Sequence, residues 1–290
     1  VFLQAKHFRQ VIRNFSPSIA DEIEHIAEGA SVDPLFIYAL NARSEILNNS
    51  TLSANISECT SLYQQQNSVL AQNWDWSETL ESLVVLMRLQ LPNGHRICQL
   101  TEPGIVGKIG MSTAGFGVCL NILKLQQRIE GLPVHILLRA LLEAESFDRA
   151  KTLMHQHCSG KASHILLGGR GGRCVSLEFA GDETFEVLPD TQTLIHTNHY
   201  LHPQALGLDA FPSTHERLRK ARALVAKGAD SETLLLDRSE AELSINRAYV
   251  QSLSPGFGKV GTVFTVIMEP GRNRMRVRPG SSADFTDIKL

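Results

Sequence analysis

Residues 57–76 of the chain read SECTSLYQQQNSVLAQNWDW. Two runs of strand-like residues, 57–63 and 69–76, flank a polar link rich in Gln, Asn and Ser, and this arrangement predicts a β-hairpin. In a hairpin, chain positions roughly sixteen residues apart can lie side by side, so Cys59 and Asp75 are expected to share one end of it. A thiol followed by two hydroxyl residues, with a carboxylate close by, suggests a nucleophile with its polar support.

The hairpin resembles the acyl-coenzyme A:6-aminopenicillanic acid acyltransferase family of N-terminal-nucleophile (Ntn) hydrolases. In that family a Cys-Thr pair opens the mature catalytic chain and Asn-Trp-Asp follows about one hairpin later, which fits Cys59-Thr60 and residues 73–75. Further blocks occur in the order of the family and extend the resemblance over roughly residues 20–280: ALNARSEI (39–46), TEPGIVGKIG (101–110), HTNH (196–199) and GTVF (261–264). Taken together, the blocks identify the family, but they do not identify a substrate.

The order of the predicted elements is strands, two helices, strands, helices, strands, which indicates an α+β protein with antiparallel sheets. The resemblance narrows this to the Ntn-hydrolase four-layer αββα sandwich, with two stacked antiparallel sheets between helix layers. It also implies that residues 1–58 are a helical propeptide and residues 59–290 the catalytic domain. Both parts are expected to form one globular unit.

Residues 1–50 have a helical pattern. Ser16 followed by Pro17 is a good helix start, and Ile19, Ile23 and Ile26 then recur at helical spacing. A second helix is expected over residues 35–46. The polar segment 48–55 would form an exposed linker, as a cleavable junction before Cys59 requires.

After the hairpin, turn residues separate short strands from a few helices. Ser213 is expected to cap a basic amphipathic helix that runs to Lys227, and Asp230 to cap a short one. The remaining expectations are strands at 83–91, 96–101, 107–110, 115–122, 162–167, 174–179, 184–188 and 193–197, helices from Pro133 and Ser146, and a hairpin at 263–268 and 275–278.

Composition excludes several classes of protein. The net charge is −2 and aromatic residues are sparse, so neither nucleic acid nor an anionic membrane is an expected partner. No apolar run approaches the length of about 18 residues that a membrane span needs. The five cysteines are odd in number and contain no Cys-x-x-Cys, which argues for reduced thiols in the cytoplasm. The ending Ile288-Lys289-Leu290 only faintly resembles a peroxisomal signal, and the first residues suggest that the chain begins inside a longer reading frame.

The resemblance assigns roles to four residues. If the bond between Glu58 and Cys59 is cut, Cys59 gains an α-amine that titrates at about 7.7–8.0 and can act as general base for its own thiol. Asp75 would hold that amine, and the side-chain amide of Asn198 would donate to the oxyanion. The family carries an Arg shortly before its C-terminal strand, and Lys259 is the nearest candidate here.

Other readings of these residues stay open on position alone. Cys59 could be a buried structural thiol, Asp75 a turn residue, and Lys259 a solvated loop residue. Thr60, Tyr63 and Thr113 are candidates for the substrate pocket.

Neither a metal nor a cofactor is expected. His196 and His199 would face opposite sides of a strand, which argues against a metal pair. The glycine-rich segment 168–172 lacks the spacing of a phosphate-binding loop and predicts a hairpin turn. A coenzyme A thioester would be a substrate.

The chain is therefore interpreted as a self-processing cysteine Ntn amidohydrolase or acyltransferase that acts on a small N-acyl or aminoacyl amide, or on an acyl-coenzyme A, through a Cys59 acyl-enzyme. Hydrolysis is favoured over penicillin production because no residue marks a β-lactam pocket. The propeptide would remain bound as a heterodimer. The family has Gly before its Cys, whereas this chain has Glu58. That departure favours the alternative, an uncut and non-catalytic member that serves as a binding protein.

Overall fold

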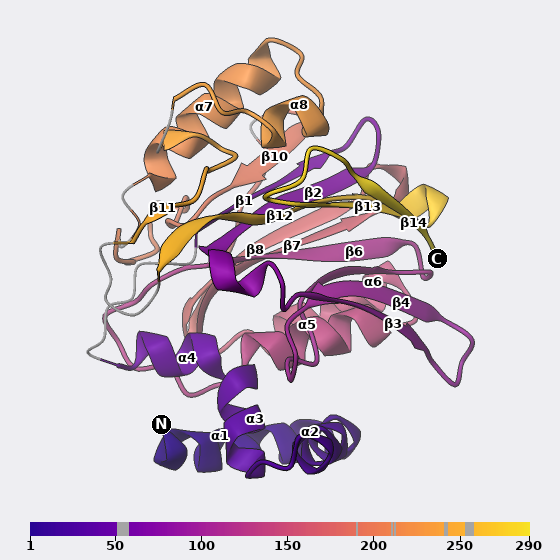
Figure 1. Cartoon of the computed structure of the whole chain (residues 1–290), viewed down its shortest axis with the longest axis vertical. Helices are drawn as coiled ribbons and strands as arrows, with labels where there is room; N and C mark the ends of the chain where they lie inside the picture. The colour runs from indigo at the N-terminus through magenta and orange to yellow at the C-terminus, as the bar shows by residue number, and fades with distance from the viewer. Residues whose placement is uncertain (51–57, 190, 210, 212, 241–242, 253–257) are drawn as a thin grey trace.

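The computed structural model describes residues 1–50, 58–189, 191–209, 211, 213–240, 243–252 and 258–290 (Figure 1). Two antiparallel sheets lie face to face, and helices cover the outer face of each sheet (Figure 1). The linker expected at 48–55 lies mostly outside the described residues, as do residues 56 and 57.

The first sheet carries the hairpin with which the sequence analysis begins. Its order is β10-β1-β2-β12-β13-β14, with β11 paired to β12. The register pairs Glu58 with Asp75 and Cys59 with Trp74. Cys59 and Asp75 therefore share one end of the hairpin, as expected. The strands are β1 (Glu58–Gln64), β2 (Val69–Ser77), β10 (Thr193–His196), β11 (Val250–Gln251), β12 (Lys259–Glu269), β13 (Arg274–Pro279) and β14 (Thr286–Lys289).

The second sheet is a meander in which each strand pairs with the next along the chain. It consists of β3 (Val85–Gln90), β4 (Arg96–Thr101), β5 (Ile109–Ser112), β6 (Phe116–Ile122), β7 (Lys161–Gly169), β8 (Cys174–Gly181) and β9 (Glu183–Glu186). Gly107 precedes β5 where a Cβ atom would lie 2.3 Å from the carbonyl oxygen of His135, so only glycine lets helix α5 (Val134–Glu143) approach this closely.

Three apolar clusters hold the layers together. One fills the space between the two sheets and includes Cys59 and Trp74. A second packs α7 (Thr214–Ala226) and α8 (Ser231–Leu235) on the first sheet. The third and largest packs α5 (Val134–Glu143) and α6 (Phe147–Gln156) on the second sheet. The α+β, four-layer expectation is thereby met.

The N-terminal helices α1 (Phe2–Phe15), α2 (Pro17–Ala30) and α3 (Pro34–Asn41) lie beyond α5 and α6, whereas α4 (Arg43–Asn48) lies level with α5 and contacts β7 (Figure 1). Ser16 caps α2 through its side chain, as expected. Ile19, Ile23 and Tyr38 are buried and belong to the same apolar cluster as α5. The N-terminal segment thus shares a core with the rest of the chain.

Ser213 differs from its expected role. It stands at the N-cap position of α7, but its side chain makes no capping hydrogen bond. Its hydroxyl instead donates to the carboxylate of Glu58 and accepts from Arg217 Nε. A residue that the sequence assigns to a helix cap is therefore used at the junction.

Among the residues that the structure describes, no helix is both long enough and apolar enough to cross a membrane.

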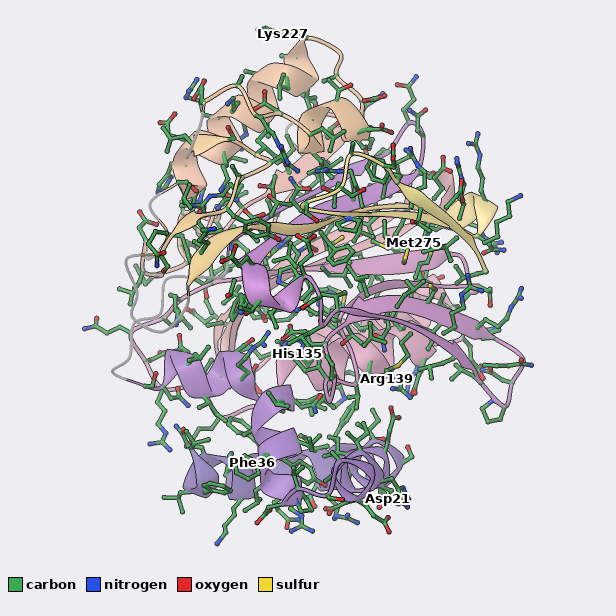
Figure 2. The ribbon with its side chains drawn as sticks, viewed as in Figure 1. Asp21, Phe36, His135, Arg139, Lys227 and Met275 are labelled. Carbon is green, nitrogen blue, oxygen red and sulfur yellow. The ribbon has the colours of Figure 1, made fainter. Side chains whose placement is uncertain are left out.

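We expect the N-terminal segment to stay bound after the bond between residues 58 and 59 is cut. Each buried aliphatic side chain stabilises the packed state by roughly 1.5–3 kcal/mol. Arg139 of α5, which points toward these helices in Figure 2, adds a bidentate ion pair to Glu22 at 2.7 and 2.9 Å. Native gel filtration of cut protein should give one species that contains both fragments. A freely eluting small fragment would contradict this expectation.

Candidate active site

Cys59 is the second residue of β1, and its side chain is 3% exposed in the layer between the sheets. Its cross-strand partner is Trp74, which shares that layer. Strand alternation turns the neighbouring Glu58 and Thr60 to the opposite face, where α7 packs. The peptide bond before Cys59 therefore lies where an apolar layer meets a polar one.

Arg217 of α7 binds both sides of this peptide bond. Its Nη1 donates to the carbonyl oxygen of Cys59 at 2.7 Å and to Thr60 Oγ1 at 2.9 Å. Its Nη2 lies 2.9 Å from Glu58 Oε2. The guanidinium is fully buried, and its Nε donates to Ser213. The residues on either side of the junction are thus fixed by one rigid cation.

Asn198, in the segment after β10, contacts the same junction. Its Oδ1 accepts from the backbone N–H of Cys59 at 2.6 Å and from Arg217 Nη2 at 3.0 Å. Two donors converge on this atom, so the orientation of the amide is fixed. Its Nδ2 donates to the carbonyl oxygen of Ile122 at 3.0 Å. Asn198 therefore holds the amide N–H of Cys59, the group that cleavage would turn into an α-amine, and its role as an oxyanion donor remains a prediction.

Asp75 lies opposite Glu58 in the sheet and is 1% exposed. Its Oδ1 accepts from Thr262 Oγ1 at 2.7 Å. Among the described residues its Oδ2 is buried with no hydrogen-bond partner. Burial raises the pKa of this carboxyl to about 6, although the charges of Arg247 and Arg217 oppose the rise. Asp75 is therefore ionised at neutral pH and has one acceptor free for a new donor.

The thiol itself is protonated at neutral pH in the uncut chain. Burial, and next the charge of Asp75, raise the pKa of Cys59 to about 12. Almost no thiolate exists at neutral pH at such a value, and the thiolate is the nucleophilic form. A base close to the sulfur is needed before Cys59 can react.

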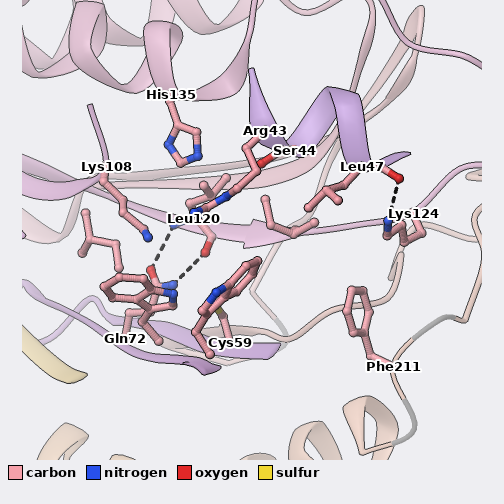
Figure 3. Close-up of a pocket in the computed structure, with 14 residues that line it drawn as sticks. Arg43, Ser44, Leu47, Cys59, Gln72, Lys108, Leu120, Lys124, His135 and Phe211 are labelled. Atoms are coloured by element: carbon pink, nitrogen blue, oxygen red, sulfur yellow. Dashed lines mark hydrogen bonds between the residues drawn. The ribbon is translucent and has the colours of Figure 1, made fainter. Parts of the chain in front are cut away.

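A cavity of about 30 Å³ lies beside Cys59 (Figure 3). Such a space holds only one or two water molecules. One wall comes from α4 of the N-terminal segment, through Arg43, Ser44 and Leu47. The other lining residues are Gln72, Trp74, Trp76, Lys108, Ile109, Leu120, Ile122, Lys124, His135 and Phe211. The walls are mainly apolar and aromatic.

A buried charge cluster closes one side of the cavity. Glu102 accepts two hydrogen bonds from Arg43, at 2.6 and 2.9 Å, and pairs with Lys108. The ammonium of Lys108 lies 3.2 Å from the centroid of the Trp74 ring. Burial lowers the pKa of Lys108 to about 8, partly offset by Glu102. The N-terminal segment thus supplies Arg43 to a charge cluster that contacts Trp74, the cross-strand partner of Cys59.

Lys259 is not at this site. It begins β12 three residues before Thr262, its side chain is 55% exposed, and its recorded ion pair is with Glu78 at 3.7 Å. The buried cations at the junction are Arg217 and Arg247, the latter 2.7 Å from Glu58 Oε1. The expectation for Lys259 is corrected accordingly: it lies too far along the strand, past the end of the hairpin.

Two of the three pocket candidates lie elsewhere. Tyr63 is buried further along β1 and donates to the carbonyl oxygen of Gly169. Thr113, in the turn between β5 and β6, accepts from the backbone N–H of Arg96 at 2.9 Å. Neither lines the cavity. Thr60 does contact the site, through Arg217, but from the helix-covered face of the sheet.

The two histidines of residues 196–199 serve separate networks. His196 pairs with Glu178 at 2.7 Å, whereas His199 contacts Thr214 at 2.9 Å. The described part of the chain contains no cluster of His, Cys, Asp or Glu suited to a metal.

Sequence reasoning missed three site residues. Arg217 lies on the same helical stripe as Leu218 and Ala221, and a charged residue at a core position of an amphipathic helix was a usable signal. Asn121, which donates to the carbonyl oxygen of Cys59 at 3.2 Å, lies in a polar break in strand β6. Arg247 lies in a segment with no periodic pattern, and nothing local distinguishes it.

The fold is that of an Ntn hydrolase. Two solved structures share it: the N-acylethanolamine-hydrolyzing acid amidase ortholog of Caenorhabditis elegans and the conjugated bile acid hydrolase of Clostridium perfringens. The first has a TM-score of 0.51 and 18% identity, covering 73% of this chain and 93% of that one. The second has a TM-score of 0.54 and 11% identity, covering 81% and 92%. At these identities the likeness concerns the fold alone.

Sequence comparison gives the family. Residues 63–284 match the family described as acyl-coenzyme A:6-aminopenicillanic acid acyl-transferase. The 40 kDa form of the acyl-coenzyme A:6-aminopenicillanic-acid-acyltransferase of Emericella nidulans is 31% identical over 288 residues, which is 95% of this chain and 78% of that protein. The chain belongs to this family, and the resemblance seen in the sequence is confirmed.

The positions of Arg217 and Lys259 predict opposite mutational outcomes. Arg217→Met removes the cation that holds both sides of the junction, and misplacement of the reacting groups should slow self-cleavage by about a hundredfold. Lys259→Met changes an exposed side chain and should leave cleavage within about twofold of wild type. The measurement is the fraction of cut chain over time on a denaturing gel, with thermal unfolding in parallel. Equal cleavage by both variants would contradict the assignment.

Proposed function

We propose that the chain is a self-processing cysteine amidohydrolase or acyltransferase that acts on small N-acyl or aminoacyl amides, or acyl-coenzyme A, through a Cys59 acyl-enzyme. The observation that carries this proposal is that Asn198 holds the N–H of the peptide bond before a buried thiol, while Arg217 binds the residues on either side of that bond. The name of the Emericella nidulans relative describes an acyltransferase for acyl-coenzyme A and 6-aminopenicillanic acid, which supports the substrate class.

Self-cleavage would begin with attack of the Cys59 sulfur on the carbonyl carbon of Glu58. The S–C bond forms, the C–N bond breaks, and the thiol proton moves to the nitrogen, which becomes the α-amine of Cys59. Water then hydrolyses the thioester and frees the carboxyl group of Glu58. The unpartnered Oδ2 of Asp75 would accept a hydrogen bond from the new amine.

Cutting would also activate the thiol for turnover. An α-amine titrates at about 7.7–8.0, so at neutral pH part of it is unprotonated and can take the thiol proton. The amine would form beside the sulfur and so place a base next to the thiol. The cavity of about 30 Å³ would have to widen to admit a substrate, and α4 forms one of its walls.

A second candidate is an uncut, non-catalytic binding protein. One observation favours it. Glu58 is buried and paired with both Arg217 and Arg247, and the charges of these two residues lower the pKa of Glu58 despite its burial. These pairs stabilise the intact junction and oppose departure of the residue that precedes the nucleophile.

Cys59→Ala distinguishes the two candidates. Wild-type protein should separate on a denaturing gel into a fragment that ends at Glu58 and one that begins at Cys59, whereas Cys59→Ala should remain one chain and lose activity. Incubation of cut protein with a panel of amides and thioesters should add an acyl mass to the larger fragment. Cleavage of Cys59→Ala as efficient as that of wild type would refute self-processing. A wild type that stays whole and takes up no acyl group would support the binding protein.

If the α-amine of Cys59 is the base, no histidine is required for turnover. His199→Ala should therefore reduce activity modestly, through packing against Thr214. Asn198→Ala should cost about a hundredfold in kcat, because it removes the oxyanion donor. Both variants must be measured as fully cut protein, since an uncut variant would be inactive for another reason. Loss of turnover in His199→Ala, with activity kept in Asn198→Ala, would instead indicate a Cys–His pair.

A further inference from the structure

Glu58 occupies a complete binding site for a carboxylate. Its Oε2 lies 2.9 Å from Arg217 Nη2 and accepts from the hydroxyl of Ser213, and its Oε1 lies 2.7 Å from Arg247 Nη1. We call Ser213, Arg217 and Arg247 the carboxylate clamp. Each oxygen of the bound carboxylate has its own guanidinium, and such charge-assisted hydrogen bonds are the strong ones.

The occupant of the carboxylate clamp changes when the chain is cut. In the uncut chain the two guanidinium groups are balanced by Glu58 and Asp75. Glu58 becomes a chain end after cleavage, and its departure leaves the clamp with Asp75 as the remaining carboxylate that acts on it. The α-amine of Cys59 adds further positive charge. A buried cation without its counter-ion is unstable, so the cut site favours an incoming anion.

The covalent geometry defines which anion fits. The thioester formed in self-cleavage joins Cys59 Sγ to the carbonyl of Glu58, whose side-chain carboxylate lies three carbon atoms beyond that carbonyl. It would therefore be an acyl-enzyme whose carboxylate lies in the carboxylate clamp before the acyl group moves from nitrogen to sulfur. A glutaryl group, or an α-linked glutamyl group, attached to the same sulfur has the same separation between carbonyl and carboxylate.

We propose that the cut protein selects acyl donors whose acyl chain carries a carboxylate three carbons from the reacting carbonyl, and that Ser213, Arg217 and Arg247 hold this carboxylate. This inference rests on the proposed function and names its substrate class. The sulfur of Cys59 bonds to the donor carbonyl, the C–N bond breaks, and the thiol proton passes through the α-amine to the leaving amine. Water then breaks the C–S bond, which releases the diacid and restores the thiol. The carboxylate clamp exchanges no proton.

The first test compares two p-nitroanilides of equal chain length on fully cut protein, one glutaryl and one pentanoyl. A site built to bind a polar group rejects an analogue that lacks it, so kcat/KM should be at least about tenfold higher for the glutaryl compound. In Arg247→Gln this ratio should fall towards one. Arg219→Gln is the matched control, because Arg219 lies on α7 with Arg217 of the clamp but is 60% exposed and pairs with Glu216. It should keep the wild-type ratio.

The second test measures binding without turnover. Cys59→Ala keeps Glu58 in the carboxylate clamp, whereas the double variant Glu58→Gly/Cys59→Ala empties it in one intact chain. Glutarate should raise the thermal unfolding midpoint of the double variant more than pentanoate does, and should not raise that of Cys59→Ala. Adding Arg247→Gln to the double variant should abolish the effect.

The two tests separate the inference from the function on which it rests. If both anilides acylate Cys59 with equal kcat/KM and glutarate stabilises neither variant, the inference is overturned and the proposed function stands. If glutarate stabilises only the double variant but no donor acylates Cys59, the proposed function fails and the anion site stands. Preference for the pentanoyl compound overturns the inference, since the acyl chain then lies in the apolar cavity.

Discussion

The buried guanidinium of Arg217 is the contact on which the rest of the site depends. It joins α7 to β1 by hydrogen bonds to the carbonyl oxygen of Cys59 and to Thr60, and it pairs with Glu58. A fully buried cation is costly unless every donor finds a partner, and the backbone and side chains of the hairpin supply these partners. Ser213 gives up its role as a helix cap to complete the set. The Ser213 side chain therefore holds Glu58 and Arg217 in place and does not cap α7.

The same contacts explain how the uncut chain keeps a nucleophile inactive. Burial between the sheets raises the pKa of the Cys59 thiol to about 12, and the nitrogen of Cys59 is an amide that Asn198 holds. The proposed cleavage would change one group, from amide to amine. Asp75, opposite Glu58 in the sheet, has a buried oxygen without a hydrogen-bond partner among the described residues. The proposed activation would therefore use an acceptor that the uncut chain already holds.

How much the sequence predicts depends on whether the signal is local. The hairpin with Cys59 and Asp75 at one end, the helix start at Ser16 and the four-layer arrangement followed from local pattern together with family blocks. The cation at the site did not. The family pattern points to Lys259 by its position in the chain. In the structure, however, the pairing of β12 with β2 begins at Val260, so Lys259 lies past the end of β2. Arg247 reaches Glu58 from a segment without periodicity, so only the tertiary fold could identify it.

The glutamate before the nucleophile connects these observations. A glycine there, as the family pattern has it, would leave Arg247 without its recorded ion pair in the uncut chain. The two arginines would then favour any anion that could reach them, before cleavage as well as after it. Glu58 instead satisfies them from within, so the site is closed to outside carboxylates while the chain is intact. Cutting the bond after Glu58 would create the base, and the departure of Glu58 from the clamp would free the anion site. In this arrangement activity and selectivity both depend on cleavage of a single peptide bond.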